Sequence, residues 1–395
     1  MKALIVPMLM STHMTELVPL SWALRAAGHQ VLIGGDPDIA PTARGAGLNL
    51  AEIGEMVALD EQTRQGLPPE MFPLEVLASR TTEDGKVWWG QGAAALVPNA
   101  AAQIDDFLAL AADWKPDVVI GDGMSLLGWL VGSAVDVPFV RQLTGLAPLT
   151  GPFYDTARQM LAPTVERLGR PGLAEPDLTI DPVPASLQSE DAPAADIRVR
   201  YAPYNGAGNL PGWARHRPEK RRVCVIFGSS TPMTGPRPVH NVLKALGDVP
   251  GIEVVVTLSA ESHAVVGPLP EWAMPVERMP LNLFLETCDL VIHHGGAGTG
   301  LTATAFGLPQ VVLPQWGTSF DFARRLAEAG AGFSFRSRAE QDDIDAIRTA
   351  IVRALEEPAV RAAARGIRDE MRSLPPMHAA VERIEKLVSS GEAGH

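Results

Sequence analysis

The feature that most constrains the fold is a glycine-rich run, HHGGAGTG, at residues 293–300. The residues before it, 289–292, predict a short buried strand, and residues 301–306 predict a helix that ends at Gly307. A strand, a tight turn and a helix in direct succession are typical of chains that build parallel sheets covered by helices. The run therefore predicts an α/β fold.

The same run predicts a site for an anion. The first turn of a helix carries unpaired N–H groups and the positive end of the helix dipole, and glycines let a pyrophosphate approach the backbone. The two imidazoles and the hydroxyl of Thr299 would add hydrogen-bond donors. The spacing fits neither GxxxxGK[ST] nor GxGxxG, which disfavours a P-loop or a standard dinucleotide fingerprint. We expect a diphosphate to be held by His293, Gly296, Ala297, Gly298 and Thr299. The alternative is that the glycines serve only the tight packing of the strand against the helix.

Strands and helices alternate along the chain in two separate series, which is the pattern of two parallel sheets with helices on both faces. The first series has expected strands at 2–6, 31–34, 117–121 and 139–143, and helices at 15–27 and 126–135. The second has expected strands at 223–227, 253–258, 290–293 and 310–313, and helices at 280–287 and 379–388. Two Rossmann-like halves follow from this alternation.

A stretch rich in proline, alanine and glycine, residues 181–218, separates the two series and predicts the interdomain linker. We therefore expect a first domain at 1–213, a second at 214–374 and a C-terminal segment at 375–395. A chain of 395 residues with 46% hydrophobic content is long enough to bury two sizeable cores.

Composition argues against several classes of function. The formal net charge of −13 disfavours nonspecific nucleic-acid binding, which needs basic patches. No apolar run reaches membrane length, and the apolar start of MKALIVPMLMSTH is too short and broken for a signal peptide. The two cysteines, Cys224 and Cys288, cannot form a disulfide framework and suit a reducing compartment, so we expect a cytoplasmic protein.

Three segments resemble the family 1 glycosyltransferases of the GT-B fold, especially the bacterial enzymes that glycosylate antibiotic aglycones. The run HHGGAGTG, followed by LTATAFGLPQVVLP and FARRLAEAGAG, is similar to the C-terminal signature of that family. Residues 11–31 (STHMTELVPLSWALRAAGHQV) resemble its N-terminal segment, and residues 200–213 (RYAPYNGAGNLPGW) its lead-in to the linker. The resemblance implies two Rossmann-like domains whose parallel sheets face a central cleft, with the last helix crossing back to the N-terminal domain.

His13 is the candidate catalytic base. It follows the expected strand 2–6 and the loop 7–12, and ligands of open α/β sheets lie beyond the carboxyl ends of the strands. An imidazole can accept a proton near neutral pH; the alternative is an ordinary histidine at a helix start. The resemblance implies that Asp122, directly after an expected strand, hydrogen-bonds to this histidine. The alternative for Asp122 is a turn residue in the sequence GDGM.

Further donor contacts are expected in two segments. Ser229 and Ser230 follow an expected strand, where they would form a second clamp on the diphosphate or an ordinary turn. The resemblance implies that the nucleotide base rests on residues 276–281, read by backbone groups around Met279. The alternative for that segment is an edge strand that leads into a helix.

One departure from the family concerns the donor sugar. Many relatives have an Asp-Gln pair after the LPQ motif, where it bonds sugar hydroxyls, whereas this chain has Thr318 and Ser319. Fewer hydrogen-bond acceptors therefore remain for the hydroxyl groups of an ordinary hexose. A deoxysugar, which has fewer hydroxyl groups, would lose the fewest hydrogen bonds. We therefore expect a TDP-deoxyhexose as the donor.

The acceptor is expected to bind in the N-terminal domain. An adaptable apolar wall for a flat aglycone is expected from Met8, Met10, Phe72, Trp88 and Trp89. Core packing is the alternative for each of these side chains, and a polyketide aglycone is implied by the resemblance.

Neither a metal nor a cofactor is expected besides the nucleotide sugar, which is a co-substrate. The triplets at 36–38 and 343–345 have the DxD spacing of metal-dependent transferases of the other major fold, but an acidic chain contains such triplets by chance.

Together these features predict an inverting glycosyltransferase. His13, oriented by Asp122, would deprotonate an acceptor hydroxyl, which attacks the anomeric carbon as the nucleotide diphosphate leaves toward residues 293–300. An ortho carbon of a phenol could attack instead and give a C-glycoside. Two other functions stay open: a nucleotide-sugar epimerase of similar architecture, and a catalytically silent donor-binding helper. The partners would be an aglycone and a nucleotide sugar, of TDP or UDP, with a homodimer left open.

Overall fold

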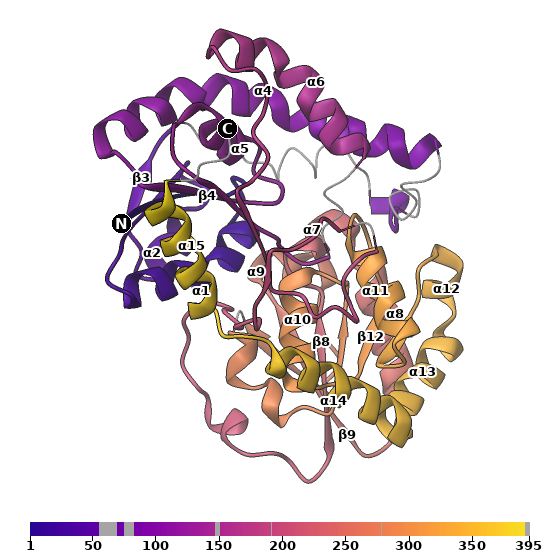
Figure 1. Ribbon diagram of the computed structural model, residues 1–395. Helices are drawn as coiled ribbons and strands as arrows, with labels where there is room; N and C mark the ends of the chain where they lie inside the picture. The colour runs from indigo at the N-terminus through magenta and orange to yellow at the C-terminus, as the bar shows by residue number, and fades with distance from the viewer. Residues whose placement is uncertain (55–68, 75–82, 147–150, 191, 278, 392–395) are drawn as a thin grey trace.

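The computed structural model describes residues 1–54, 69–74, 83–146, 151–190, 192–277 and 279–391. The described chain forms two α/β domains, one above the other in Figure 1, and each is built on a single parallel sheet. The two parallel sheets that the alternation of strands and helices predicts are therefore present.

Within the described residues, the N-terminal sheet has seven strands in the order β3-β2-β1-β4-β5-β6-β7. They are β1 (Lys2–Val6), β2 (Gln30–Gly35), β3 (Leu50–Glu52), β4 (Val118–Asp122), β5 (Phe139–Gln142), β6 (Leu178–Asp181) and β7 (Ile197–Arg198). Alternate side chains of β1 enter different cores, Ile5 on one face of the sheet and Leu4 on the other. This is the burial of a strand that is covered on both faces.

Helices cover the two faces of this sheet. One face packs against α1 (Ser11–Ala26), α2 (Ala40–Gly45) and α15 (His378–Ser390), and the other against α4 (Glu83–Trp114), α5 (Leu126–Ala134) and α6 (Pro152–Arg167). The C-terminal helix α15, yellow in Figure 1, lies beside α1, and its Val381 and Ile384 are buried in the N-terminal core. The end of the chain therefore packs on the N-terminal domain.

The C-terminal sheet has the order β10-β9-β8-β11-β12-β13 in the part of the chain that is described. Its strands are β8 (Arg221–Ile226), β9 (Ile252–Leu258), β10 (Ala273–Glu277), β11 (Leu290–His293), β12 (Gln310–Val312) and β13 (Gly332–Ser334). Its helices are α7 (Thr231–Thr234), α8 (Arg237–Gly247), α9 (Ala260–Val266), α10 (Ala297–Phe306), α11 (Ser319–Glu328), α12 (Arg338–Asp342), α13 (Ile344–Glu356) and α14 (Pro358–Ser373). Buried Val and Ile side chains fill the strands, as expected for a sheet covered on both faces.

The expected strands are all present, with ends displaced by at most two residues. The expected helix at 280–287 is wrong, because the structure has two 3₁₀ turns there, Leu281–Leu283 and Leu285–Thr287. Phe284, at φ −135°, interrupts the helical path between them, and the Thr287 hydroxyl donates to the Phe284 carbonyl oxygen. The helix expected at 15–27 begins earlier, at Ser11.

Each sheet has a point where the strand order reverses direction. In the N-terminal sheet, the chain leaves β1 and β4 in opposite directions along the sheet, and in the C-terminal sheet the same holds for β8 and β11. Ligands of doubly wound sheets bind beyond the carboxyl ends of the strands at such points. The loops after these four strands are therefore the places to look for a site.

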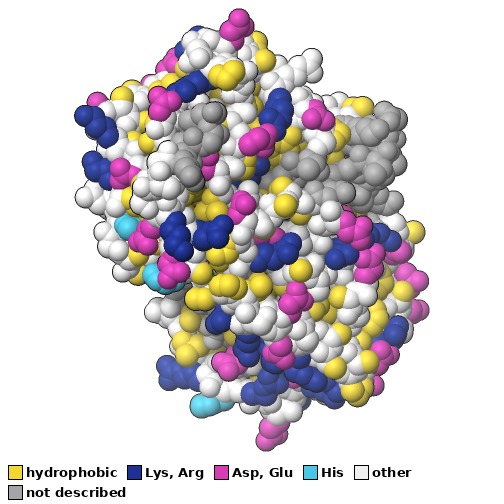
Figure 2. All heavy atoms as spheres, viewed as in Figure 1, with side chains coloured by type: hydrophobic (Ala, Val, Ile, Leu, Met, Phe, Trp, Pro, Cys, Tyr) yellow, Lys and Arg dark blue, Asp and Glu magenta, His cyan; other side chains and the backbone are white. Residues whose placement is uncertain are grey.

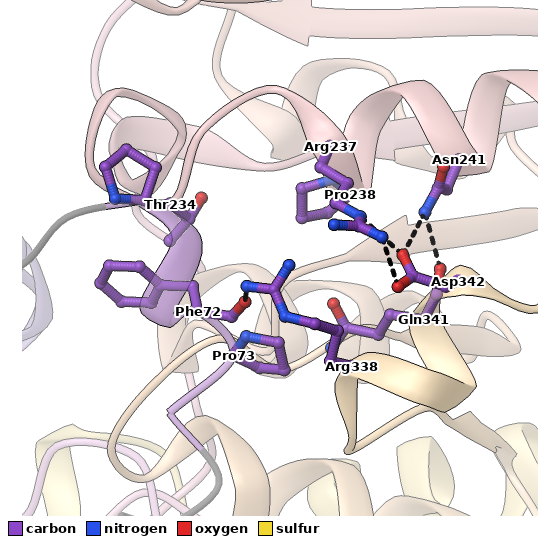
Figure 3. A pocket seen from close by; sticks show the side chains of 10 residues that line it. Phe72, Pro73, Thr234, Arg237, Pro238, Asn241, Arg338, Gln341 and Asp342 are labelled. Atoms are coloured by element: carbon purple, nitrogen blue, oxygen red, sulfur yellow. Dashed lines mark hydrogen bonds and ion pairs between the residues drawn. The ribbon is translucent and has the colours of Figure 1, made fainter.

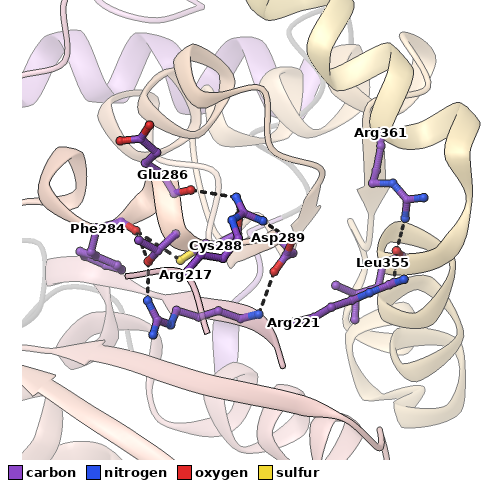
Figure 4. A network of polar contacts seen from close by, with 10 residues as sticks. Arg217, Arg221, Phe284, Glu286, Cys288, Asp289, Leu355 and Arg361 are labelled. Atoms are coloured by element: carbon purple, nitrogen blue, oxygen red, sulfur yellow. Dashed lines mark hydrogen bonds and ion pairs between the residues drawn. The ribbon is translucent and has the colours of Figure 1, made fainter. Parts of the chain in front are cut away.

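The linker is fixed at its far end to the C-terminal domain. Arg217 Nη1 donates to Asp289 Oδ1 at 2.7 Å, and its Nη2 donates to the carbonyl oxygen of Glu286 at 2.9 Å (Figure 4). Arg221, which begins β8, donates to the carbonyl oxygen of Leu355 at the end of α13. These contacts fix the start of β8 relative to β11, the strand that leads into the glycine-rich run 293–300.

Exchange of Gly332 for alanine tests the close packing of the second sheet. A Cβ at Gly332 would lie 2.0 Å from the carbonyl oxygen of Gln310 on the neighbouring strand. We expect Gly332→Ala to lower the free energy of unfolding by about 1–3 kcal/mol, as overpacking does. The matched control Gly366→Ala, on an exposed face of α14 with open space around it, should raise it by about 0.5–1 kcal/mol. Urea unfolding followed by circular dichroism measures both, and equal effects would contradict the packing.

Candidate active site

The structure brings His13 and Asp122 together at the switch point of the N-terminal sheet. His13 lies in the first turn of α1, and Asp122 is the last residue of β4. His13 Nδ1 lies 3.0 Å from Asp122 Oδ1. The buried Asp122 carboxylate also accepts hydrogen bonds from the N–H groups of Met8 (2.6 Å) and Met124 (2.8 Å). This is the hydrogen bond that the family resemblance implies.

The environment of Asp122 favours its ionised form. Burial by itself would raise its pKa, but the charge and hydrogen bond of His13, with the amides of Met8 and Met124, outweigh burial and hold the pKa below its usual value. Asp122 therefore accepts the Nδ1 proton of His13, which makes Nε2 the nitrogen that can take up a proton. The His13 side chain is 17% exposed, so a hydroxyl group can reach it.

The two histidines of the run 293–300 have different roles. His293 is buried at the end of β11, where its Nε2 donates to Gln310 Oε1 (2.8 Å) and its Nδ1 accepts the N–H of Gly295 (3.0 Å). Burial, and then the neighbouring His294, lower the pKa of His293 to about 3, so the ring is neutral. Both ring nitrogens are engaged within the protein. In this arrangement the His293 ring has no N–H left for the diphosphate contact that the sequence predicts.

His294 lies beside both glycine loops. A Cβ at Gly296 would be 2.6 Å from its Nε2, and a Cβ at Gly228 would be 3.3 Å from its Cε1. Burial lowers the pKa of His294 to about 4, so this ring is also neutral. Its Nδ1 has no hydrogen-bond partner among the described residues. His294 is the histidine of the pair that is placed to contact an anion at these loops.

The first turn of α10 has the features of an anion site. Its N-cap is Gly296, and no side chain caps the helix in the described structure. The N–H groups at the start of this ten-residue helix therefore point outward beyond its N-terminus. Gly295 has φ +85°, and a Cβ there would lie 2.8 Å from Ser319 Cβ, so the turn requires glycine.

The N-terminal domain and the linker contact this first turn directly. A Cβ at Gly145, in the loop after β5, would lie 2.4 Å from Ala297 Cβ. The Tyr201 hydroxyl donates to the Gly298 carbonyl oxygen at 3.5 Å, and Asn205 Nδ2 donates to Thr302 Oγ1 at 3.2 Å. The first turn of α10 is therefore at the interface of the two domains.

Of the second loop, Ser230 is buried, and its hydroxyl donates to the Phe227 carbonyl oxygen at 2.6 Å. The hydroxyl therefore closes its own turn, and the predicted contact with a diphosphate would need this bond to be exchanged. The side chain of Ser229 lies outside the described residues. Gly228, at φ +57°, brings this loop against His294.

The two residues that replace the family's Asp-Gln pair differ in exposure. Ser319 is buried, and its hydroxyl donates to the Trp316 carbonyl oxygen and accepts from the Trp316 N–H. The Ser319 hydroxyl therefore closes the loop that precedes α11. Thr318 is the N-cap residue of α11 and is half-exposed.

Phe72 joins the two domains instead of lining an open pocket. Its ring is 3% exposed and packs with Leu74, Met233 and Trp316. Arg338 of α12 donates to the carbonyl oxygens of Glu70 and Phe72, and Figure 3 shows its guanidinium directed at the Phe72 carbonyl. The Leu74 N–H donates to the Gln315 carbonyl oxygen at 2.8 Å. Phe72 thus packs at the interface of the two domains, away from Met8 and Met10, with which the sequence predicts it to form the acceptor wall.

The other expected acceptor residues lie in the N-terminal domain. Met8 is buried in the loop after β1, and Met10 is the half-buried N-cap residue of α1, three positions before His13. Trp89 of α4 is half-buried, with its ring edge-to-face to Phe153 at a centroid distance of 6.4 Å. The side chain of Trp88 lies outside the described residues.

Met279 lines a groove at the edge of the C-terminal domain. The groove has a volume of about 330 Å³ and lies between the linker and the end of β10 with the residues that follow it. Its lining comprises Gly208, Asn209, Pro211, Trp213, Pro275, Val276, Glu277, Met279 and Pro280. The segment 276–281 therefore borders an open space, except that Arg278 lies outside the described residues.

The described residues contain no cluster of three or more His, Cys, Asp or Glu side chains that could hold a metal ion. In the first DxD triplet, Asp36 Oδ1 accepts the N–H of Asp38, and in the second Asp343 caps the N-terminus of α13. None of the helices in the described ranges is long and apolar enough to cross a membrane. Figure 2 shows acidic and basic side chains interspersed over the face in view.

Comparison with known proteins decides the family. Residues 22–228 match the model "Erythromycin biosynthesis protein CIII-like, N-terminal domain", and residues 240–387 match its C-terminal counterpart. The chain belongs to the EryCIII-like glycosyltransferases. The L-demethylnoviosyl transferase of Streptomyces niveus is 34% identical, with 91% of this chain and 90% of that protein covered. The tylactone mycaminosyltransferase of Streptomyces fradiae is 32% identical, with 98% and 93% covered.

Solved structures agree with this family. The spinosyn rhamnosyltransferase SpnG superimposes with a TM-score of 0.90 and 39% identity, covering 98% of this chain and 100% of that chain. Structures of SpnG complexed with thymidine diphosphate and with spinosyn aglycone match equally closely, with TM-scores of 0.90 and 0.89. The expected GT-B fold and the expected glycosyltransferase activity are confirmed. This result excludes the two alternatives, a nucleotide-sugar epimerase and a catalytically silent helper.

Three residues of this EryCIII-like glycosyltransferase that lie near His13 or the first turn of α10 are not predicted from the sequence. Glu16 lies one turn after His13 on α1, a spacing that places both on one helix face. Tyr201 and Asn205 lie in the segment RYAPYNGAGNLPGW, which the family resemblance and the composition of residues 181–218 both connect with the linker. Their contacts with α10 become visible only in the folded chain.

Exchange of Asp122 for asparagine tests the orientation of His13. The amide can donate to Nδ1 and favour the other tautomer, so we expect Asp122→Asn to lower kcat by about 10²–10⁴-fold with little change in KM for the donor. Steady-state sugar transfer measures this. The control Asp177→Asn alters a carboxylate that accepts the Phe139 N–H at the opposite edge of the sheet and should keep kcat within about twofold. Equal losses in both variants would contradict the assignment.

Proposed function

We propose that this glycosyltransferase transfers a deoxyhexose from a TDP-deoxysugar to a polyketide-type aglycone with inversion at the anomeric carbon. The observation that carries the proposal is the His13–Asp122 pair at the switch point of one sheet, in a protein whose other switch point presents the uncapped first turn of α10. A base and an anion site on two domains in contact are what transfer from a nucleotide diphosphate requires. The product would be an O-glycoside or a C-glycoside.

The reaction follows from these two groups. His13 Nε2 takes the proton of an acceptor hydroxyl while Asp122 stabilises the imidazolium that forms. The acceptor oxygen forms a bond to the anomeric carbon as the bond from that carbon to the diphosphate oxygen breaks. The oxygens of the leaving diphosphate accept hydrogen bonds from the N–H groups of residues 297–299 and contact the ring of His294. A single displacement of this kind inverts the anomeric configuration.

Support for a TDP-deoxysugar comes from the chain and from its relatives. Thr318 and Ser319 replace the Asp-Gln pair, and the Ser319 hydroxyl is used within its own loop, which leaves few acceptors for sugar hydroxyls. SpnG is a rhamnosyltransferase with a thymidine diphosphate complex, and the relative from S. fradiae is a mycaminosyltransferase. Those names describe sugars that lack hydroxyl groups of an ordinary hexose.

Support for a polyketide-type acceptor is similar in kind. Met8 and Met10 precede His13 in the chain, and Trp89 belongs to the long helix α4 of the same domain. Such side chains suit a large apolar ligand. SpnG has been solved with spinosyn aglycone, and the S. fradiae relative acts on tylactone.

We propose that residues 1–213 bind the acceptor and residues 214–374 the nucleotide sugar, with the base of the nucleotide in the groove at Met279. The free thiols of Cys224 and Cys288, both buried, suit a cytoplasmic protein.

Exchange of His13 for alanine tests the catalytic base. We expect His13→Ala to retain TDP affinity, because the ring is not part of α10, and to lose transfer by about 10²–10⁴-fold. Calorimetric titration with TDP and a transfer assay measure the two effects. His378→Ala, which removes a 62% exposed imidazole, is the matched control and should behave like wild type. Unchanged turnover in His13→Ala would refute the assignment.

Parallel titrations of the wild-type protein with TDP and UDP test the donor. We expect TDP to bind more tightly, by about tenfold or less, since the two differ in a methyl group and a ribose hydroxyl. The absence of binding for both nucleotides would contradict the diphosphate site, and a preference for UDP would contradict only the choice of TDP.

A further inference from the structure

Glu16 directs a carboxylate at the first turn of α10. It lies on α1 one turn after His13, and its Oε1 lies 3.0 Å from the position of a Cβ at Gly298. A side chain at Gly298 would therefore displace it. The Glu16 carboxylate has no hydrogen-bond partner in the described part of the chain, although its backbone carbonyl accepts Gln142 Nε2 at 2.9 Å. An acid thus reaches across the interface to the helix end that is proposed to hold the diphosphate.

Among the residues that the structure describes, three ionisable groups face Glu16. They are His13 on its own helix, Asp122 at the end of β4, and Tyr201 from the linker. The first turn of α10, residues 297–300, carries no ionisable side chain. Burial, opposed by His13 and reinforced by Asp122, raises the pKa of Glu16 to about 7. At neutral pH the protonated and ionised forms are both populated.

A diphosphate and an ionised carboxylate at the same helix end would repel each other, whereas a protonated carboxyl group can donate a hydrogen bond to a phosphate oxygen. We propose that Glu16 binds a proton when the nucleotide donor binds and donates a hydrogen bond to its diphosphate, so that donor binding takes up a proton from solvent. This inference rests on the proposed function. Glu16 is a positioning residue for the leaving group, distinct from the base His13.

Proton uptake has a predictable effect on affinity. If TDP binds only to protein in which Glu16 is protonated, the apparent Kd equals the intrinsic Kd divided by the protonated fraction of Glu16. That fraction is about one tenth at one pH unit above the pKa of Glu16. The wild-type Kd for TDP should therefore rise about eightfold between pH 7.5 and pH 8.5, where the phosphates of TDP are largely ionised throughout. Glu16→Gln keeps an N–H donor without an ionisable proton, so it should bind TDP with nearly constant Kd over the same range.

The test is calorimetric titration of the full-length protein with TDP at pH 8 in HEPES and in Tris, which differ in heat of ionisation. The difference between the two observed enthalpies gives the number of protons taken up. We expect close to one proton for wild type and close to none for Glu16→Gln. Because TDP itself is fully ionised at pH 8, its own phosphate adds little to this number.

Two further variants separate the sources of the proton. Glu271→Gln, at an exposed position of the C-terminal domain, makes the same change of charge and should behave like wild type. His13→Gln should keep proton uptake at Glu16, in a smaller amount at pH 8, because loss of the imidazole raises the pKa of Glu16. Loss of uptake in His13→Gln with its retention in Glu16→Gln would overturn the proposal and assign the proton to His13.

The remaining outcomes are also decisive. Binding of TDP to wild type without proton uptake would overturn the role of Glu16 and leave the proposed function intact. No binding of TDP to wild type would overturn both. The wild-type measurement needs no variant, so it decides the matter even where Glu16→Gln fails to fold.

Discussion

The contact between the N-terminal domain and the first turn of α10 is the constraint on which the active site depends. The uncapped turn ends in outward N–H groups, and parallel topology places it beyond the carboxyl edge of its sheet. Gly145 lies against Ala297, and Tyr201 and Asn205 hydrogen-bond to the same helix. The proposed base and the proposed anion site are thereby held on opposite sides of one interface, so the alignment of acceptor and donor would depend on how the two domains pack.

Electrostatics at this interface rest on backbone dipoles and neutral rings. Burial lowers the pKa of His293 and of His294, so neither imidazole brings a positive charge to the glycine-rich turn. The negative charge of a diphosphate would be met by oriented N–H groups, which need no counter-ion and no reorganisation. In such a place one more carboxylate, that of Glu16, has a large effect, because few charges are present to compensate it. The ionised Asp122 is tolerated because three donors surround it.

Much of the fold could be predicted from the sequence, because buried strands and amphipathic helices leave local patterns. The strands around residues 2–6 and 290–293 were found by their apolar runs and by the glycines that follow them. Residues 280–287 are predicted to be a helix but form two 3₁₀ turns. The interruption at Phe284 depends on packing, and the periodicity of the sequence does not report that packing. The pairing of His13 with Asp122 came from the position of each after a strand together with the family resemblance.

The sequence by itself determined which chemistry this chain can perform: a histidine and an aspartate after two strands, and a glycine turn that opens a helix. Only the tertiary structure decided which side chains are available for that chemistry. His293 and Ser230 carry suitable groups, but buried polar groups must be hydrogen-bonded. His293 bonds Gln310 of the neighbouring strand and the Gly295 N–H, and Ser230 bonds the Phe227 carbonyl oxygen. Phe72 is buried between the domains, and Glu16 reaches α10 from the other domain. Such contacts join residues far apart in the chain, and local sequence patterns hold no information about them.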